Sequence, residues 1–274
     1  MANKEVAQAA LDRAEEEKNL LLVYQPIHDA RTREVYGAEA LMRQRRRTGE
    51  IREASVITTA AEEGTHEELF ALDSWALRTA LSTAAAWPIR INVNLSPREF
   101  QEGNVVPRLT ELLTGCGFDP RQINLEITET AYIRKPHRTT DVLTELKKLG
   151  IELWLDDFGT GHSTMEHLQQ FPVDGLKLSS SFIKGLRDDH RCRAITRALI
   201  ALAHDLQMKV IAEGVEHEEQ VEQLLDWQCD YIQGFLFSKP MTAEDLDVRL
   251  RSRTSTPPAH SDRAARRGPS SRSS

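Results

Sequence analysis

Eight short apolar runs alternate with helix-like segments along most of this 274-residue chain, and this alternation constrains the fold more than any other feature. The first run begins at Leu20 and the last ends at Phe237. One strand followed by one helix takes ~30 residues in a barrel of the TIM type. The sequence therefore predicts an α/β fold, a TIM-like (β/α)8 barrel, over residues 19–249. The first two runs, separated by a polar turn, could pair as an antiparallel hairpin.

The segments on either side of the predicted barrel differ from it in composition. Residues 1–18 carry alanines and a run of glutamates, which predicts a leading helix. Serine, threonine, proline and arginine dominate residues 250–274, which predicts a disordered basic tail. The formal net charge of the whole chain is −7, so the body without this tail is strongly acidic. An acidic body argues against binding to duplex nucleic acid.

Neither a membrane anchor nor a cysteine-based site is predicted. No apolar run approaches the ~20 residues that a membrane helix needs, and the first residues lack the apolar core of a signal peptide. We therefore expect a cytoplasmic protein that does not bind membranes. Cys116, Cys192 and Cys229 lie far apart, which argues against a zinc site or a disulfide framework.

Polar residues recur near the ends of the predicted strands. The run at residues 153–155 ends in two adjacent acids, Asp156 and Asp157, which repel each other unless they share a cation. In (β/α) barrels the chemistry collects at the carboxyl ends of the strands. Seven of the eight predicted strands carry such residues, which are expected to converge on one mouth: Glu39, Asn94, Glu126, Asp156, Asp157, Lys177, Glu213 and Gln233.

Some positions near this mouth have a second interpretation. The segment around Glu39 favours a helix as much as a strand. Arg43, on the same strand face as Glu39, could bind a phosphate through its guanidinium or pair with a surface acid. Lys177 lies between two leucines, where it could act as a base, hold a water or a phosphate, or extend to solvent.

The candidate ligands all offer oxygen, and none is a histidine or a cysteine. Oxygen donors select hard cations such as Mg²⁺ or Mn²⁺ over zinc or copper. Two such ions that share Asp156 would lie ~3.5 to 4 Å apart, an arrangement used to hydrolyse phosphodiesters. The residues alone therefore predict a two-metal hydrolytic site.

The stretch Glu39-Ala40-Leu41-Met42-Arg43 resembles the signature of the EAL domain family, the cyclic di-GMP phosphodiesterases. Six further matches to that family follow in order, and the resemblance spans roughly residues 20–246. They are Asn94-Leu95-Ser96, Glu126-Ile127-Thr128-Glu129, the stretch at 156–161, Lys177, the stretch at 212–216, and Gln233-Gly234. The resemblance implies a barrel whose first strand runs antiparallel to the others.

The resemblance also implies a role for each matching residue. The implied metal ligands, for two Mg²⁺ or Mn²⁺ ions, are Glu39, Asn94, Glu126, Asp156, Asp157 and Glu213. The implied catalytic residues are Lys177, Glu213, Asp156 and Asp157, with Lys177 in contact with the attacking water and the identity of the base left open. The substrate groove would be lined by Gln25, Arg43, Gln233 and Glu216. Glu129 would anchor a loop that contains Phe158, Gly159 and Thr160 and couples the site to a dimer interface.

The implied reaction is metal-dependent hydrolysis of cyclic di-GMP to linear pGpG by a homodimer. We expect no further sensory domain within the given length, and regulation would then require a protein partner, changes in expression, or dimerisation. Three departures from the family pattern stand out: Ser179 in place of an aspartate, His162 in the loop, and the lack of the usual proline and phenylalanine at 44–57. Ser179 favours an alternative, a catalytically silent module that binds the dinucleotide or a protein. A barrel enzyme acting on another phosphate substrate is a third hypothesis.

Overall fold

The computed structural model describes residues 20–46, 48–54, 66–96, 105–128, 136–159, 168 and 171–254. The leading helix predicted for residues 1–18 lies outside these residues, as does the predicted tail beyond Thr254. Within the described part of the chain, no helix is both long enough and apolar enough to span a membrane.

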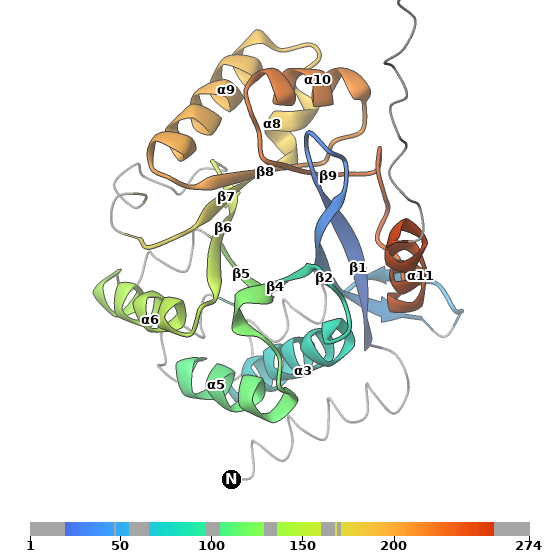
Figure 1. Ribbon diagram of the computed structural model, residues 1–274, viewed down its shortest axis with the longest axis vertical. Coiled ribbons are helices and arrows are strands. Elements are labelled where there is room, and N and C mark those ends of the chain that lie inside the picture. Colours follow the sequence, from blue (N-terminus) through green and yellow to red (C-terminus); the bar gives the residue numbers. More distant parts are fainter. Residues whose placement is uncertain are drawn as a thin grey trace, which may run out of the picture.

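Nine strands of the described chain form one sheet, and eight of them close into a barrel (Figure 1). The first strand pairs antiparallel with both the second and the last, and this double pairing closes the ring. The other barrel strands run parallel to one another. The predicted TIM-like barrel with an antiparallel first strand is therefore confirmed. The barrel strands are β1 (Leu20–Asp29), β2 (Val35–Arg45), β4 (Arg90–Leu95), β5 (Ile123–Thr128), β6 (Glu152–Phe158), β7 (Gly175–Leu178), β8 (Lys209–Glu213) and β9 (Tyr231–Gln233).

Helices surround this ring of strands (Figure 1). They are α3 (His66–Ala84), α5 (Val105–Cys116), η1 (Pro120–Gln122), α6 (Pro136–Lys148), α8 (Ser180–Lys184), α9 (His190–Asp205), α10 (Glu218–Asp226) and α11 (Ala243–Thr254). A ninth strand, β3 (Ile51–Glu53), pairs antiparallel with the end of β2. Sequence analysis did not anticipate β3, α8 or α11.

Two expected boundaries differ from those in the structure. Helix α11 continues to Thr254 and buries Leu250, so part of the segment assigned to the tail after residue 249 is helical. Strand β9 ends at Gln233, although the apolar run continues to Phe237. The chain turns there because Gly234 lies against the backbone of Val215, where an added Cβ would be 2.1 Å from the Val215 carbonyl oxygen. The Leu236 N–H then donates to that oxygen at 3.1 Å.

Side chains alternate between the inside and the outside of the barrel wall. On β5, Ile123, Leu125 and Ile127 join the large apolar cluster that packs the sheet against the helices. Asn124 and Glu126 point to the opposite face and are fully buried inside the ring. This alternation explains how polar residues occupy a strand that reads as mostly apolar.

Part of the barrel interior is filled by an apolar layer, formed by Ile27, Trp154, Ile211 and Tyr231. Trp154, the bulkiest fully buried side chain, fits there because its neighbour Gly175 has no Cβ. A Cβ at Gly175 would lie 2.5 Å from the Trp154 ring. Three members of the layer precede a mouth residue by two positions, so they lie directly beneath the mouth on the same strand face.

Candidate active site

Lys177 stands at the centre of the barrel mouth, and its side chain is 1% exposed. Its Nζ lies 2.6 Å from Glu213 Oε1 and 2.7 Å from Glu126 Oε2. Asp156 Oδ1 is 3.1 Å away, and Glu39 Oε2 is 3.5 Å away. Burial opposes the charged form, but these carboxylates outweigh it and hold the pKa of Lys177 well above its usual value. Lys177 is therefore an ammonium enclosed by acids, and the alternative in which it extends to solvent is wrong.

Glu39 lies on β2, which resolves the choice between helix and strand for this segment. Its Oε1 accepts a hydrogen bond from Asn94 Nδ2 at 2.9 Å, and its Oε2 accepts one from Gln233 Nε2 at 2.9 Å. Burial would raise the pKa of Glu39, but the Lys177 ammonium and these hydrogen bonds lower it on balance. Glu39 is therefore held as a carboxylate, and three predicted site residues meet at it.

Glu126 lies on β5 and is fully buried. Its Oε1 accepts a hydrogen bond from Asn92 Nδ2 at 2.6 Å, and its Oε2 accepts one from Lys177 at 2.7 Å. Burial and the nearby carboxylate of Glu39 raise the pKa of Glu126 well above its usual value. Asn92 was not among the predicted site residues. The alternation of Asn92 and Asn94 along β4, which places both on the same face, was the signal that could have revealed it.

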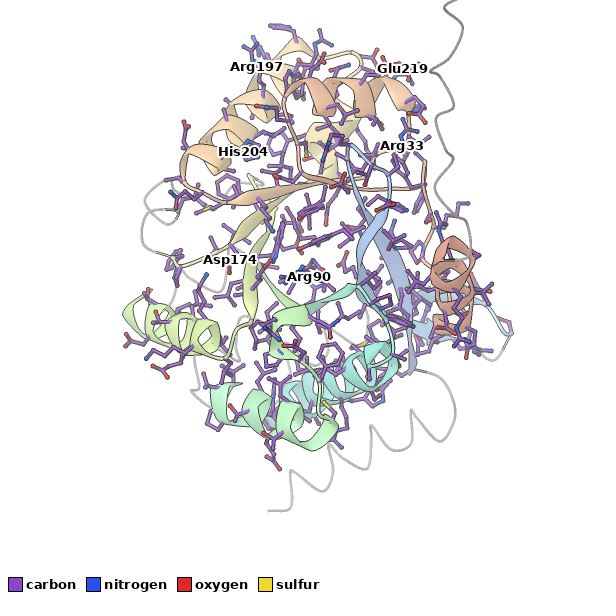
Figure 2. The ribbon with its side chains drawn as sticks, viewed as in Figure 1. Arg33, Arg90, Asp174, Arg197, His204 and Glu219 are labelled. Carbon is purple, nitrogen blue, oxygen red and sulfur yellow. The ribbon has the colours of Figure 1, made fainter. Side chains whose placement is uncertain are left out.

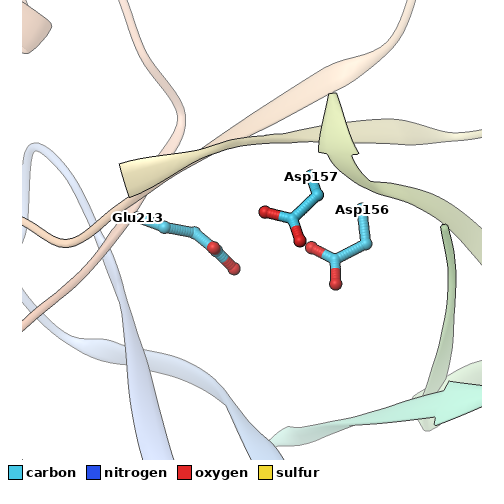
Figure 3. Close-up of side chains that lie close together, drawn as sticks. All are labelled: Asp156, Asp157 and Glu213. Carbon is cyan, nitrogen blue, oxygen red and sulfur yellow. The ribbon is translucent and has the colours of Figure 1, made fainter. Parts of the chain in front are cut away.

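Asp156, Asp157 and Glu213 form a second part of the mouth (Figure 3), with ligand oxygens that all lie within 4.8 Å of one another. Neighbouring residues on a regular strand point to opposite faces, yet here both aspartates face Glu213. The register of β6 against β7 shifts between Leu155 and Phe158, and Asp157 has a φ of 52°. This irregularity redirects the Asp157 side chain, as β-bulges commonly do beside active sites.

Glu213 has a pKa of about 7, raised by burial and by the carboxylates of Asp156 and Glu39 against the opposing effect of Lys177.

Two buried oxygens of the mouth lack a hydrogen bond within the described part of the chain. Asp156 Oδ1 faces Lys177 without a well-aligned hydrogen bond, and Gln233 Oε1 is buried with no hydrogen-bond partner among the described residues. Four carboxylates therefore surround one ammonium, Asp157 adds a fifth to the mouth, and two buried oxygens have unused acceptor capacity. This donor set fits hard divalent cations.

The predicted groove residues lie around this mouth with mixed exposure. Gln25 is opposite Glu39 in the β1–β2 register, and its Nε2 donates to the Ser238 carbonyl at 3.2 Å. Arg43 is half-buried, and its Nη1 donates to the Met42 carbonyl at 2.9 Å. Glu216 is exposed, and its backbone N–H donates to Gln220 Oε1 at 2.8 Å. Gln233 reaches the carboxylate cluster directly, through its hydrogen bond to Glu39.

The predicted loop anchors are only partly described. Glu129 and Thr160 lie outside the described residues. Phe158 is buried in the apolar core rather than exposed in the mouth. Gly159 has a φ of 94° and lies so close to Phe182 of α8 that an added Cβ would be 2.7 Å from that ring.

Ser179, at the position where the family pattern has an aspartate, is the N-cap residue of helix α8 (Ser180–Lys184). Ser179 is buried and caps the helix, with its Oγ accepting from the Ser181 N–H at 3.5 Å. The next residue, Ser180, packs against Gly214, where an added Cβ would lie 2.6 Å from the Ser180 Cβ. The first turn of α8 therefore contacts the residues that follow both Asp157 and Glu213 in the chain.

Phe235 is an exposed aromatic residue that sequence analysis missed. It lies two positions after Gln233, and 56% of it is exposed. Lys239 Nζ lies 5.7 Å from the centroid of its ring. The signal that could have identified it was its place two positions after the last mouth residue, in a run otherwise interpreted as a strand.

Comparison with known proteins agrees with this geometry. The EAL domain pattern matches residues 8–240. An uncharacterized signaling protein of Caulobacter vibrioides is 40% identical over 235 residues, which cover 85% of this chain and 29% of that protein. The chain spans less than half the length of the curated relatives it matches.

Solved structures share the fold. The PaMucR phosphodiesterase in complex with c-di-GMP superposes with a TM-score of 0.80 at 32% identity, covering 88% of this chain and 99% of that one. BlrP1 of Klebsiella pneumoniae, in a complex with calcium and cy-diGMP, gives a TM-score of 0.72 at 27% identity, covering 81% of this chain and 56% of that one. The family pattern covers most of the described barrel, and this chain therefore belongs to the EAL domain family.

Proposed function

We propose that this chain is a metal-dependent phosphodiesterase that hydrolyses cyclic di-GMP to linear pGpG. The observation that carries the proposal is the cluster of five carboxylates at the mouth, four of which surround the buried ammonium of Lys177. Enzymes of the EAL family use divalent metals, and structural neighbours of this chain were solved with c-di-GMP bound. In this proposal Mg²⁺ or Mn²⁺ ions would be held by Glu39, Asn94, Glu126, Asp156, Asp157 and Glu213.

Divalent ions bound there would supply charge neutralisation at the phosphate and would lower the pKa of a water molecule. Lys177 provides three N–H donors in a dry site, where an ammonium can orient a water or a phosphate oxygen. Glu213, with a pKa of about 7, is a group that can exchange a proton near neutral pH.

Residues at the rim would bind the rest of the substrate. Arg43 offers a guanidinium, which suits a phosphate because its donors match two oxygens at once. Phe235 offers an exposed ring, on which a guanine base can stack. Gln25 and Gln233 offer amides at the same end of the barrel, and Glu216 offers an exposed carboxylate.

The test is chromatographic detection of pGpG from purified protein and cyclic di-GMP with Mg²⁺, Mn²⁺ or EDTA. We expect product only with metal, and none from Glu39→Ala, because this change removes the acceptor of both Asn94 and Gln233. Glu219→Ala, at an exposed position of α10, is the matched control and should retain the rate of the unmodified protein. Metal-independent turnover, or full activity in Glu39→Ala, would contradict the proposal.

Ser179 supports one alternative, a silent module that binds the dinucleotide or a protein without hydrolysis. The same assay separates the two functions, because a receptor binds cyclic di-GMP and yields no pGpG. Competition with other phosphodiesters tests the third hypothesis, a different phosphate substrate. We also propose that the chain forms a homodimer and is regulated by a protein partner. Sedimentation of the purified chain with and without cyclic di-GMP tests the homodimer.

A further inference from the structure

A line of polar side chains runs through the barrel interior from its floor to the mouth. Arg90 Nη1 donates to Asn124 Oδ1 at 3.0 Å, and Asn124 Nδ2 donates to Asn92 Oδ1 at 3.0 Å. Asn92 Nδ2 then donates to Glu126 Oε1 at 2.6 Å. Both asparagines and Glu126 have no exposed surface, and Arg90 lies within the ring of strands (Figure 2). We call these four residues the polar line.

The register of two neighbouring strands builds this line. Asn92 is paired with Asn124, and Asn94 with Glu126, in the parallel ladder of β4 and β5. Alternate residues of a strand share one face, so Arg90 and Asn92 of β4 point to the same side as Asn124 and Glu126 of β5. Each hydrogen bond therefore steps between the two strands while it rises toward the mouth.

The line has one direction, which Arg90 sets at the floor in agreement with the acceptor oxygen of Glu126 at the mouth. A guanidinium carries donors and no acceptor, so Asn124 must present its oxygen to Arg90 and its NH₂ group to Asn92. Asn92 must then present its oxygen to Asn124 and its NH₂ group to Glu126. If either amide rotated by a half-turn, two like groups would face each other at a fully buried position, where an unmade hydrogen bond is expensive.

Arg90 is itself held in place at the floor. Its Nη2 lies 2.7 Å from Glu152 Oε1, and its guanidinium lies 6.0 Å from the centroid of the Tyr36 ring. Two asparagine side chains separate Arg90 from Glu126, and Arg90 holds both in the orientation that presents the NH₂ group of Asn92 to that carboxylate. With Oε1 fixed by Asn92, Glu126 turns its other oxygen to Lys177.

We propose that Arg90 is a positioning residue, which acts through Asn124 and Asn92 to fix the rotation of the Glu126 carboxylate in the mouth. This inference rests on the proposed function, because it assigns the line a role in metal binding and hydrolysis. Partners that orient metal ligands from outside typically change metal affinity or activity by ~10- to 100-fold when they are removed. The polar line extends such support across the depth of the barrel.

The test measures Mn²⁺ affinity by titration calorimetry, together with the melting temperature and the KM and kcat for cyclic di-GMP. Arg90→Met and Asn92→Leu should each weaken Mn²⁺ binding by ~10-fold or more. The double variant should lose little beyond Asn92→Leu alone, because both changes break the same line. Arg90→Lys keeps a donor for Asn124 and should recover most of the affinity. Arg121→Met, at a surface arginine paired with Asp119, is the matched control and should bind Mn²⁺ normally.

A second readout keeps the inference separate from the proposed function. The side-chain NH₂ signals of Asn92 and Asn124 in NMR spectra should be protected from solvent exchange in the metal-free protein, and lose protection in Arg90→Met but not in Arg121→Met. If the unmodified protein neither binds Mn²⁺ nor hydrolyses cyclic di-GMP, the proposed function fails and this comparison alone decides the inference. Unchanged Asn92 signals in Arg90→Met, or a lower melting temperature with unchanged Mn²⁺ affinity, would overturn it.

Discussion

The two sides of the barrel interior use opposite chemistry at positions two residues before the mouth residues of their strands. Beneath the mouth on β4 and β5, Asn92 and Asn124 form hydrogen bonds that lead to Glu126. Beneath it on β6, β8 and β9, Trp154, Ile211 and Tyr231 form an apolar layer. The apolar side excludes water and supplies packing, whereas the polar side fixes the orientation of a carboxylate. This difference indicates that a charged mouth needs apolar packing that excludes water and also hydrogen bonds that fix the orientation of its carboxylates.

The largest expected effect comes from the ammonium that links the two sides. Lys177→Met leaves the mouth carboxylates without their buried cation, and breaking a buried ion pair in this way costs ~3 to 5 kcal/mol of unfolding free energy. Urea denaturation at pH 8 with EDTA measures this loss, and added Mn²⁺ should recover part of it. Lys209→Met removes an exposed lysine of the neighbouring strand and should cost far less. Equal losses in the two variants would contradict the central place of Lys177.

A change confined to the apolar side should affect stability more than metal binding. Gly175→Ala places a Cβ 2.5 Å from the Trp154 ring, and such overpacking typically costs ~1 to 3 kcal/mol. Gly115→Ala, where nothing lies within 4 Å of the added Cβ, is the control and should be neutral or slightly stabilising because it lies in α5. Thermal melts and Mn²⁺ titrations measure the two quantities. If Gly175→Ala weakened Mn²⁺ binding as strongly as Asn92→Leu, the division between the sides would be wrong.

The pH dependence of metal binding should reflect Glu213. Its pKa of about 7 means that metal must displace a proton at pH 6 but not at pH 8, so Mn²⁺ should bind about tenfold more weakly at pH 6. Because this pKa is raised in the folded state, the protonated group stabilises the metal-free fold at low pH, and that contribution is lost as pH rises through about 7. Calorimetry at both pH values tests the change in Mn²⁺ affinity. Glu213→Gln should reduce the difference in affinity between pH 6 and pH 8.

The smallest expected effect comes from Ser179, the N-cap residue of α8, which stands where the family pattern has an aspartate. Ser179→Asp keeps a side chain that can cap the helix, so the unfolding free energy should change by no more than ~1 kcal/mol. The new carboxylate would lie beside the helix turn that contacts the residues after Asp157 and Glu213, and we expect it to raise kcat. Ser252→Asp, on exposed α11, is the control for an added charge. A large loss of stability in Ser179→Asp alone would show that this position tolerates no acid.

Much of this arrangement could be predicted because it follows local patterns. The alternation of apolar runs and helices predicted the barrel, and acids at strand ends predicted that Glu39, Glu126 and Asp156 would meet. The carboxyl ends of the strands meet at one end of a (β/α) barrel, and this was sufficient to predict that these acids lie together. The polar turn between the first two runs suggested an antiparallel hairpin, and the family resemblance implied that the first strand runs antiparallel to all the others.

Other features depend on strand register, which the pattern does not reveal. The polar line requires Asn92 to lie beside Asn124 in the β4–β5 register. The direction of the Asp157 side chain toward Glu213 requires a register shift between β6 and β7. The close contact of Gly234 with Val215, which ends β9 early, also joins segments that are adjacent only in the fold. Helix α11 was missed because its composition resembles that of the polar tail, whereas burial of Leu246 and Leu250 holds it against the barrel.

The most direct test of the central claim is anomalous diffraction at the manganese edge from crystals grown with Mn²⁺. We predict anomalous peaks at the mouth from Mn²⁺ ions bound by oxygens of Asp156, Asp157 and Glu213, with further ligands from Glu39, Asn94 and Glu126. Absence of any peak among these oxygens in crystals that contain Mn²⁺ at other positions would contradict the assignment of the carboxylate cluster as a metal centre.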